Sequence, residues 1–415
     1  MSIVKSFKGY RPKKELVAQI ASRPYDVLDS EEAKQEAAGL PYSFYHVIKP
    51  EIDLPSSVDH YASEVYNKGK ENINKLITDK ILNQDSQNRL YIYAQTMNGR
   101  TQYGVVGCVS VKDYFENVIK KHELTRPDKE EDRIKHVRIS NFHAEPVFLA
   151  YHDNTKIDTI VTKYTHGTPE YDFTATDGIS HIFWVIDNAK DIQALEQVFD
   201  KEVACLYIAD GHHRTAAAAL VGKEKASQNP HHKGDEEYNF FPAVIFPASQ
   251  LAIMDYNRVI KDLNGLSSSQ FIDKLKISFD IVEQGVEVWK PTQHHNFAMY
   301  LDGKWYSLTA KTGTYNDNDP IETLDVTVLT KQVLAPILDI ADLRTSKRID
   351  FVGGIRGLGE LKKRVDSGEM IAAFALYPVS MAQLMQISDT NQIMPPKTTW
   401  FEPKLRSGLF VHSLE

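Results

Sequence analysis

The chain has 415 residues, of which 42% are hydrophobic and 25% are charged, as in an ordinary globular protein. Its formal net charge of -8 argues against a general nucleic-acid-binding surface, so we expect no nucleic-acid partner. No apolar run is long enough to span a membrane, and the first residues lack the apolar core of a secretory signal. The two cysteines, Cys108 and Cys205, lie in apolar runs without metal-binding spacing, which is typical of a reducing compartment. We therefore expect a cytoplasmic protein that does not enter a membrane.

The N-terminal part of the chain predicts helices and one hairpin. We expect helices at 15–21, 29–38 and 61–85, and a strand at 41–55 between prolines. Asp26 follows Arg23-Pro24 and is either an N-cap of the helix at 29–38 or a carboxylate presented to a site; the cap is favoured. Asn98-Gly99, between apolar runs at 90–95 and 103–111, predicts an antiparallel hairpin.

The segment from His122 to Arg138 is dense in charge. We expect a helix at 113–121 that Pro127 breaks, which leaves His122, Glu123 and Arg126 at its end. A histidine and a carboxylate beside an arginine can supply acid–base and anion-binding groups. The stretch from Lys129 to Lys135 is interpreted as a solvated helix with i,i+4 ion pairs.

The strongest candidate for a site is IADGHHRTAAAAL, from Ile208 to Leu220. The apolar run 203–209 predicts a buried strand, Asp210-Gly211 a tight turn, and the alanines a helix. This geometry directs backbone N–H groups and the positive end of a helix dipole at one point, so we expect a phosphate there. Each residue also has an ordinary alternative role: Asp210 as an N-cap, Gly211 as a turn residue, and Arg214 in a surface ion pair.

The rest of the chain alternates helices and strands. Strands are expected at 144–151, 180–186, 240–247, 296–301, 304–308, 348–353 and 370–376, with a polar, turn-rich stretch between the first two. Helices are expected at 191–199, 268–279, 324–340 and 357–368, and 312–320 is the best candidate for a mobile loop. The tail from Ile393 to His412 is interpreted as an irregular surface strap, in which Lys397, Thr398 and Lys404 are phosphate-type donors.

The common nucleotide-binding and nucleophile motifs are absent from the sequence. It contains no G-x-x-x-x-G-K-[ST], G-x-G-x-x-G, G-x-S-x-G or C-x-x-C. Any nucleotide site is therefore of a less common type.

Five segments together resemble the family catalogued as domain of unknown function 1015. They are RPYDVL at Arg23–Leu28, KHELTRPDKEEDR at Lys121–Arg133, EPVFLAY at Glu145–Tyr151, IADGHHRTAA at Ile208–Ala217 and MPPKTTWFEPKL at Met394–Leu405. They span nearly the whole chain and are specific as a combination. One departure is Thr398-Thr399, where the family pattern has serine followed by threonine.

The DGHHR unit with its helix also resembles the nucleotide-phosphate motif of the ParB/sulfiredoxin superfamily, which includes ADP-dependent free-serine kinases. The resemblance implies an α+β fold of mixed sheets with flanking helices, in which a ParB/sulfiredoxin-like core carries large N- and C-terminal elaborations. We expect residues 1–415 to form one continuous unit, with the core at 140–262 and an α+β portion at 263–415 closing on it. The resemblance further implies that an early carboxylate, here Asp26, acts as a base on a serine hydroxyl.

These observations lead to the hypothesis of a phosphoryl-transfer enzyme. It would act between serine or phosphoserine and ADP or ATP, in the kinase or the dephosphorylating direction, with Mg²⁺ at Asp210. The expected phosphate- and nucleotide-binding residues are Gly211, Arg214, Thr215, Arg126, Lys397, Thr398 and Lys404. The expected catalytic residues are Asp26, His122, Glu123, Asp210, His212 and His213.

Two alternatives stay open at this point. A non-catalytic nucleotide-sensing regulator is disfavoured by the acidic charge and the lack of a helix-turn-helix pattern. A metal-dependent hydrolase would use His212, His213 and Asp210 as ligands, but adjacent histidines on a helix diverge. The expected partner is a small phosphorylated molecule, and the sequence leaves the oligomeric state open.

Overall fold

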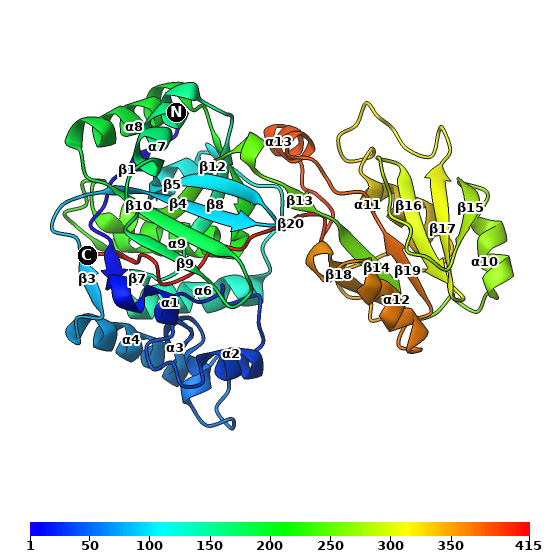
Figure 1. Ribbon diagram of the computed structural model, residues 1–415, viewed down its shortest axis with the longest axis horizontal. Helices are drawn as coiled ribbons and strands as arrows, with labels where there is room; N and C mark the ends of the chain where they lie inside the picture. Colours follow the sequence, from blue (N-terminus) through cyan, green and yellow to red (C-terminus); the bar gives the residue numbers. More distant parts are fainter. The chain divides into compact units, whose positions relative to one another are not determined.

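The computed structural model describes residues 1–415, which divide into two compact units, each described here by itself (Figure 1). Unit 1 comprises residues 1–251 and 403–415, and unit 2 comprises residues 252–402. The chain is therefore divided elsewhere than at the predicted boundary of 262/263. Thirteen α-helices and several sheets confirm the α+β class with mixed sheets, while the ParB/sulfiredoxin-like core stays a prediction. None of the helices combines the length and apolar character that a membrane span requires.

A nine-stranded mixed sheet forms the centre of unit 1. Its strand order is β6-β11-β8-β12-β5-β4-β10-β9, and β1 pairs with β5 outside this path. The strands are β1 (Val4–Lys5), β4 (Leu90–Met97), β5 (Arg100–Ser110), β6 (Ile119–Lys120), β8 (Val147–Tyr151), β9 (Tyr171–Thr174), β10 (Ser180–Ile186), β11 (Leu206–Asp210) and β12 (Phe240–Pro247). β11 runs parallel to β6 and antiparallel to β8. The predicted hairpin is confirmed, because β4 and β5 pair across Asn98 and Gly99, which both have positive φ.

Helices cover this sheet. They are α1 (Val17–Ile20), α2 (Ser30–Ala37), α3 (Tyr45–Ile48), α4 (Ser63–Thr78), α5 (Val111–Phe115), α6 (Pro127–Ser140), α7 (Thr155–Thr165), α8 (Ala189–Glu202) and α9 (His212–Gln228), with 3-10 turns at Lys14–Leu16, Pro50–Asp53, Glu237–Asn239 and Ala248–Gln250. Two small pairs complete the unit: β2 (Tyr10–Pro12) with β3 (Leu82–Gln84), and β7 (Phe142–His143) with β21 (His412–Ser413). In Figure 1, α2, α3 and α4 lie together, and α6, which contacts both α4 and α9, lies between them and the sheet.

Unit 2 is built on a six-stranded antiparallel sheet of order β15-β17-β16-β19-β14-β18. Its elements are β13 (Ile253–Met254), β14 (Tyr256–Ile260), α10 (Ser268–Leu275), β15 (Phe279–Gly285), β16 (Asn296–Leu301), β17 (Lys304–Ala310), α11 (Asp325–Leu329), β18 (Ile349–Gly353), α12 (Leu358–Asp366), β19 (Ala372–Ala375), α13 (Met381–Asp389) and β20 (Trp400–Phe401). A π-helix at Thr330–Leu334 and a 3-10 turn at Gly354–Arg356 join them. The predicted strands of this part are confirmed. The helix expected at 324–340 is confirmed over 325–334, where α11 continues into the π-helix, and it ends there instead of at 340. Helix α13 was not predicted.

Several predictions for unit 1 are wrong. Residues 41–55 form α3 and a 3-10 turn instead of a strand, because the side chains of Tyr45, Val47 and Ile48 pack into one cluster with α4. The helix expected at 113–121 ends at Phe115, and Ile119–Lys120 joins the sheet edge as β6. The stretch expected to be turn-rich contains α7 and β9. The tail is no surface strap from residue 405 on, since all of 405–412 is buried in unit 1.

Candidate functional site

The strand–turn–helix unit at Asp210-Gly211 is confirmed, because β11 ends at Asp210 and α9 begins at His212. Gly211 adopts φ +93°, and a Cβ atom there would lie 3.0 Å from Nε of Arg214. The backbone conformation therefore favours glycine, and any side chain here would press on the guanidinium of Arg214. Thr215 is fully buried, and its hydroxyl donates to the Gly211 carbonyl at 3.0 Å, so it stabilises the first turn of α9.

Asp210 forms two ion pairs at the start of α9. Its Oδ2 accepts from Nη2 of Arg214 at 2.8 Å, and its Oδ1 accepts from Nζ of Lys404 at 2.9 Å. Burial opposes ionisation of Asp210, but Lys404 and Arg214 outweigh it and hold its pKa well below the usual range. Each oxygen of Asp210 thus accepts from one cation, and its expected role as a Mg²⁺ ligand stays a prediction.

Arg214 points into the protein. Its Nη1 donates to the Pro146 carbonyl, its Nη2 binds Asp210, and its side chain is only 6% exposed. The surface ion pair considered from the sequence is therefore a buried one. Arg214 holds Asp210 in position, while Lys404, whose side chain is 15% exposed, is the cation closer to solvent.

His213, Arg126 and Asp26 lie on the outer side of the junction. Nε2 of His213 accepts from the backbone N–H of Arg126 at 3.0 Å, and the Arg126 side chain is exposed and paired with Asp128. Burial lowers the pKa of His213, and the negative charge of the nearby, exposed Asp26 opposes this shift.

Two predictions about these segments are wrong. The N-cap of α2 is Asp29, which forms a capping box with Glu32, so Asp26 is not the cap. Its carboxylate instead lies within electrostatic reach of both His213 and Arg214. Pro127 does not break a helix but begins α6, with Arg126 at the N-cap position, as the fixed φ of proline favours.

His122, Glu123 and His212 converge beside Asp210. One potential ligand atom from each lies within 4.8 Å of the others, and the two imidazoles meet edge to face with centroids 4.5 Å apart. Burial lowers the pKa of His122 to about 4 and that of His212 well below its usual value, so both rings are neutral near pH 7. His213 and Asp210 do not join this cluster, and the two adjacent histidines diverge as the helix geometry predicts.

Arg133 and Glu145 form a buried charge network that the sequence analysis missed. Arg133 binds Asp132 at 2.7 Å and Glu145 at 3.2 Å, and its guanidinium lies 3.8 Å from the ring centroid of Tyr25. Oε1 of Glu145 accepts from the Tyr25 N–H at 3.1 Å. The predicted helix at 129–135 is confirmed, and Lys135 and Glu131 form an i,i+4 ion pair. Its predicted solvation is wrong for one face, because Asp132, Arg133 and Ile134 are buried. The available signal for Glu145 was a carboxylate separated from the apolar strand β8 only by Pro146.

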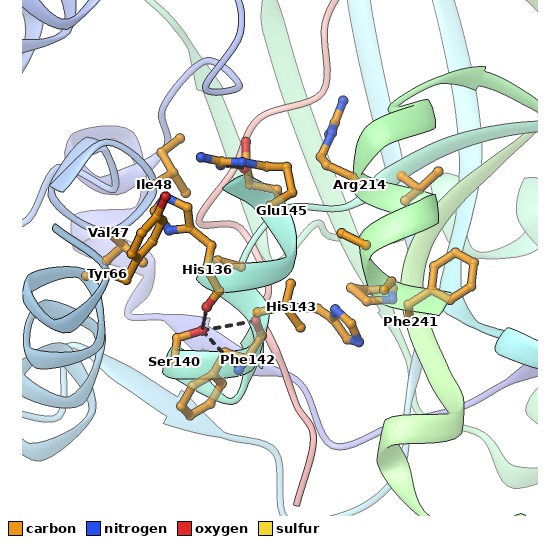
Figure 2. Close-up of a pocket in the computed structure, with 18 residues that line it drawn as sticks. Val47, Ile48, Tyr66, His136, Ser140, Phe142, His143, Glu145, Arg214 and Phe241 are labelled. Atoms are coloured by element: carbon orange, nitrogen blue, oxygen red, sulfur yellow. Dashed lines mark hydrogen bonds and ion pairs between the residues drawn. The ribbon is translucent and has the colours of Figure 1, made fainter. Parts of the chain in front are cut away.

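A cavity of about 40 Å³ lies below the junction, between α4, α6, α9 and the sheet. Figure 2 shows Arg214 and Glu145 at one side of it, His136 and His143 around it, and Tyr66 on the side of the N-terminal helices. A space of this size holds one or two waters and not a nucleotide. This cavity is therefore too small to be the expected nucleotide site.

Lys397 and Thr398 belong to unit 2. The Lys397 carbonyl accepts from Nη2 of Arg258 at 3.0 Å, and the buried Thr398 hydroxyl donates to the Pro395 carbonyl at 2.6 Å. Their role as phosphate donors stays a prediction.

The family described as "Protein of unknown function (DUF1015)" matches residues 4–327. No curated protein matches the chain. Among solved structures, the chain is similar to a conserved hypothetical protein from Pyrococcus furiosus, with 18% identity, a TM-score of 0.36, and coverage of 72% of this chain and 92% of that one.

Two further solved structures show comparable similarity. One is a free serine kinase in complex with AMP, with 15% identity, a TM-score of 0.36, and coverage of 71% and 86%. The other is SbnI with a C-terminal truncation from Staphylococcus aureus, with 10% identity, a TM-score of 0.38, and coverage of 72% and 82%. TM-scores this low carry no argument about the function of this chain.

Proposed function

The chain belongs to the DUF1015 family, and we propose that it binds a nucleotide or another phosphorylated small molecule at the β11–α9 junction. We propose further that it transfers a phosphoryl group between the nucleotide and serine or phosphoserine. Such a reaction needs positioned positive charge and an oriented hydroxyl more than covalent chemistry.

The observation that carries this proposal is the ion pair between Asp210 and Lys404 at the start of α9. Lys404 lies 194 residues beyond Asp210 in the chain and still reaches it at 2.9 Å. Lys404, Arg214 and the positive end of the α9 helix meet at this carboxylate, so donors for a phosphate gather at one point. An ammonium has three N–H donors, so Lys404 can hold Asp210 and a phosphate oxygen together.

Asp26 supports the transfer step. Its exposed carboxylate lies within electrostatic reach of His213 and Arg214, which supports a role for it beside the proposed phosphate site. A carboxylate in this position can accept the proton of a serine hydroxyl as the phosphoryl group transfers. His122 and His212 are buried, and burial lowers the pKa of each imidazole, so neither is protonated near pH 7 to act as an acid in the transfer step.

The resemblance of the DGHHR unit to the ParB/sulfiredoxin motif supports ADP or ATP as the phosphate carrier. Mg²⁺ prefers oxygen ligands, and we expect phosphate oxygens, water and Asp210 to supply them, because each oxygen of Asp210 accepts from only one cation. Arg126 lies beside His213 with an exposed guanidinium and can meet a phosphate from the outer side.

Titration calorimetry with ADP, ATP, serine and phosphoserine tests the proposal. We expect saturable binding of a nucleotide to the wild-type protein and at least about tenfold weaker binding to Lys404→Met, since one charge-assisted hydrogen bond contributes about 1.5–3 kcal/mol. Phosphorus NMR of ATP with serine, and of ADP with phosphoserine, should then show a transferred phosphoryl group.

The matched control is Lys163→Met. Lys163 of α7 also pairs with a single aspartate, Asp191 of α8, at 2.7 Å, but this pair lies in other elements and the Lys163 side chain is 59% exposed. Its loss should leave nucleotide affinity unchanged. Equal nucleotide affinity in wild type and Lys404→Met, or no binding of any compound in the panel, contradicts the proposal.

A further inference from the structure

Sheet topology brings three side chains with potential metal-ligand atoms to one edge of unit 1. β6 pairs in parallel with β11, with Lys120 opposite Tyr207, so the residues that follow both strands emerge at the same edge. His122 and Glu123 follow β6, and His212 follows β11 at the start of α9. Their ligand atoms lie within 4.8 Å of one another, which is a span that a single ion can bridge.

A buried ring nitrogen in this cluster supports the binding of a ligand there. Nε2 of His212 is buried and has no hydrogen-bond partner, and His212 as a whole is only 7% exposed. A buried polar atom without a partner costs about 1–3 kcal/mol of stability, so such atoms are rare unless a water or an ion satisfies them.

The surroundings of His122 suit a metal ligand. Its ring is hydrogen-bonded to the carbonyl of Ile208, which belongs to β11, and it is only 1% exposed. Ligand histidines characteristically use one ring nitrogen for such a carbonyl, which fixes the ring and leaves the other nitrogen to the metal.

From this geometry we propose that His122, Glu123 and His212 form a binding site for a divalent transition-metal ion, with Zn²⁺ as the best-fitting ion. Two imidazoles and one carboxylate are a donor set for zinc and its neighbours in the first transition row, whereas Mg²⁺ and Ca²⁺ prefer oxygen donors alone. Three protein ligands leave coordination positions for water or for an oxygen of a bound molecule, as in catalytic zinc sites. This site is separate from the Asp210–Lys404 pair and does not rest on the proposed phosphoryl transfer.

The test is a metal titration of tag-free protein that has been stripped with a chelator, in the absence of nucleotide. Calorimetry with Zn²⁺ should show one saturable site per chain, and Co²⁺ should give visible absorption bands at the same stoichiometry. Glu123→Gln and His212→Ala should weaken Zn²⁺ binding by more than about tenfold, because loss of a mere supporting contact costs about 10–100-fold. His231→Ala, an exposed histidine in the 230–235 loop, is the matched control and should bind like wild type.

Three results would overturn the proposal. They are no saturable binding of Zn²⁺ to the wild-type protein, wild-type Zn²⁺ affinity in Glu123→Gln, and binding of Mg²⁺ as tight as that of Zn²⁺. Circular dichroism shows whether His212→Ala folds. If His212→Ala does not fold, the Zn²⁺ affinity of Glu123→Gln tests the site instead, since Glu123 is only partly buried. Nucleotide affinity is measured separately with the Lys404 variant, so failure of the metal site leaves the proposed function standing, and the reverse also holds.

Discussion

Asp210 is the residue through which distant parts of unit 1 meet. Its two oxygens accept from Arg214, one turn along α9, and from Lys404, near the end of the chain. The DGHHR pattern predicted these residue types at a helix start, and the structure confirms the turn and the helix. The sequence could not predict that the Arg214 side chain points into the protein, because the carbonyl that it binds belongs to Pro146, 68 residues away.

Gly211→Ala should destabilise unit 1 more than an ordinary glycine substitution does. Gly211 has φ +93°, and the added Cβ would lie 3.0 Å from Nε and 3.1 Å from Cζ of Arg214, so backbone strain and a clash with a buried guanidinium add together. We expect a loss of about 1–3 kcal/mol in the free energy of unfolding, measured by urea denaturation.

Gly178→Ala is the control for that substitution. Gly178 also has a positive φ, +79°, but a Cβ atom there meets nothing within 4 Å. It should therefore show only the backbone strain, roughly 1–2 kcal/mol or less. If both variants lose the same free energy of unfolding, the Arg214 side chain can move aside at no cost and is not held in place.

At the scale of elements, α6 shows why charge density alone misleads. Its sequence suggested a solvated helix, yet Asp132, Arg133 and Ile134 lie on a buried face. The helix packs against both α4 and α9, and Arg133 is neutralised there by Asp132 and Glu145. Charges become acceptable inside a protein when they are paired and hydrogen-bonded, and the partner Glu145 belongs to another segment.

Arg133→Met should destabilise the protein strongly. The substitution keeps an apolar side chain of similar length but leaves Asp132 and Glu145 without their shared cation in a buried position. We expect a loss of about 3–5 kcal/mol in the free energy of unfolding, as for other broken buried pairs.

The same helix supplies the control. Arg138 pairs with Glu224 at 2.8 Å, but its side chain is 43% exposed. Arg138→Met should therefore cost no more than about 1 kcal/mol in the same urea denaturation. A loss for Arg133→Met as small as that for Arg138→Met would show that the buried network adds nothing to stability.

At the scale of the whole molecule, the end of the chain completes unit 1. Residues 403–415 belong to it although residues 252–402 form a unit of their own. Arg406 binds Asp177, and its Nε donates to Nε2 of His181 at 3.1 Å, while Nδ1 of His181 lies 2.7 Å from the Tyr93 hydroxyl. The tail is thus anchored in the sheet beside the strands β4 and β10.

Acid should loosen this anchor. Burial, together with the charge of Arg406, lowers the pKa of His181 from 6.5 to about 3. Because the folded state binds this proton less readily than the unfolded state, the stabilisation is fully present above pH 6.5 and is lost as the pH falls from 6.5 towards 3. The free energy of unfolding should fall by an amount on the order of a few kcal/mol across that window.

His181→Gln tests this prediction, since glutamine can still accept from Arg406 but does not titrate. Urea denaturation at about pH 7.5 and about pH 5 should show a smaller loss of stability for the variant than for wild type. The quantity to compare between wild type and variant is the change in the free energy of unfolding with pH, because burial also lowers the pKa values of His136, His143 and His412. Identical changes would exclude His181 as a contributor.

The sequence by itself determined the local parts of this protein. The turn at Asn98-Gly99, the strand–glycine–helix unit at Asp210-Gly211, and most strands follow from residue conformations and periodicity that act over a few neighbours. Short sequence segments were likewise sufficient to indicate the family, and the family model confirms it over residues 4–327.

Only the tertiary structure decided which charges face each other. The pairs Asp210–Lys404 and Arg133–Glu145, and the cluster of His122, Glu123 and His212, join residues from different elements. It also decided that 41–55 is helical and that residues 405–412 are buried, because packing against other segments overrides local preference. Two buried charges pair only if they lie close in space, and residues far apart in the sequence give no local sign that they will do so.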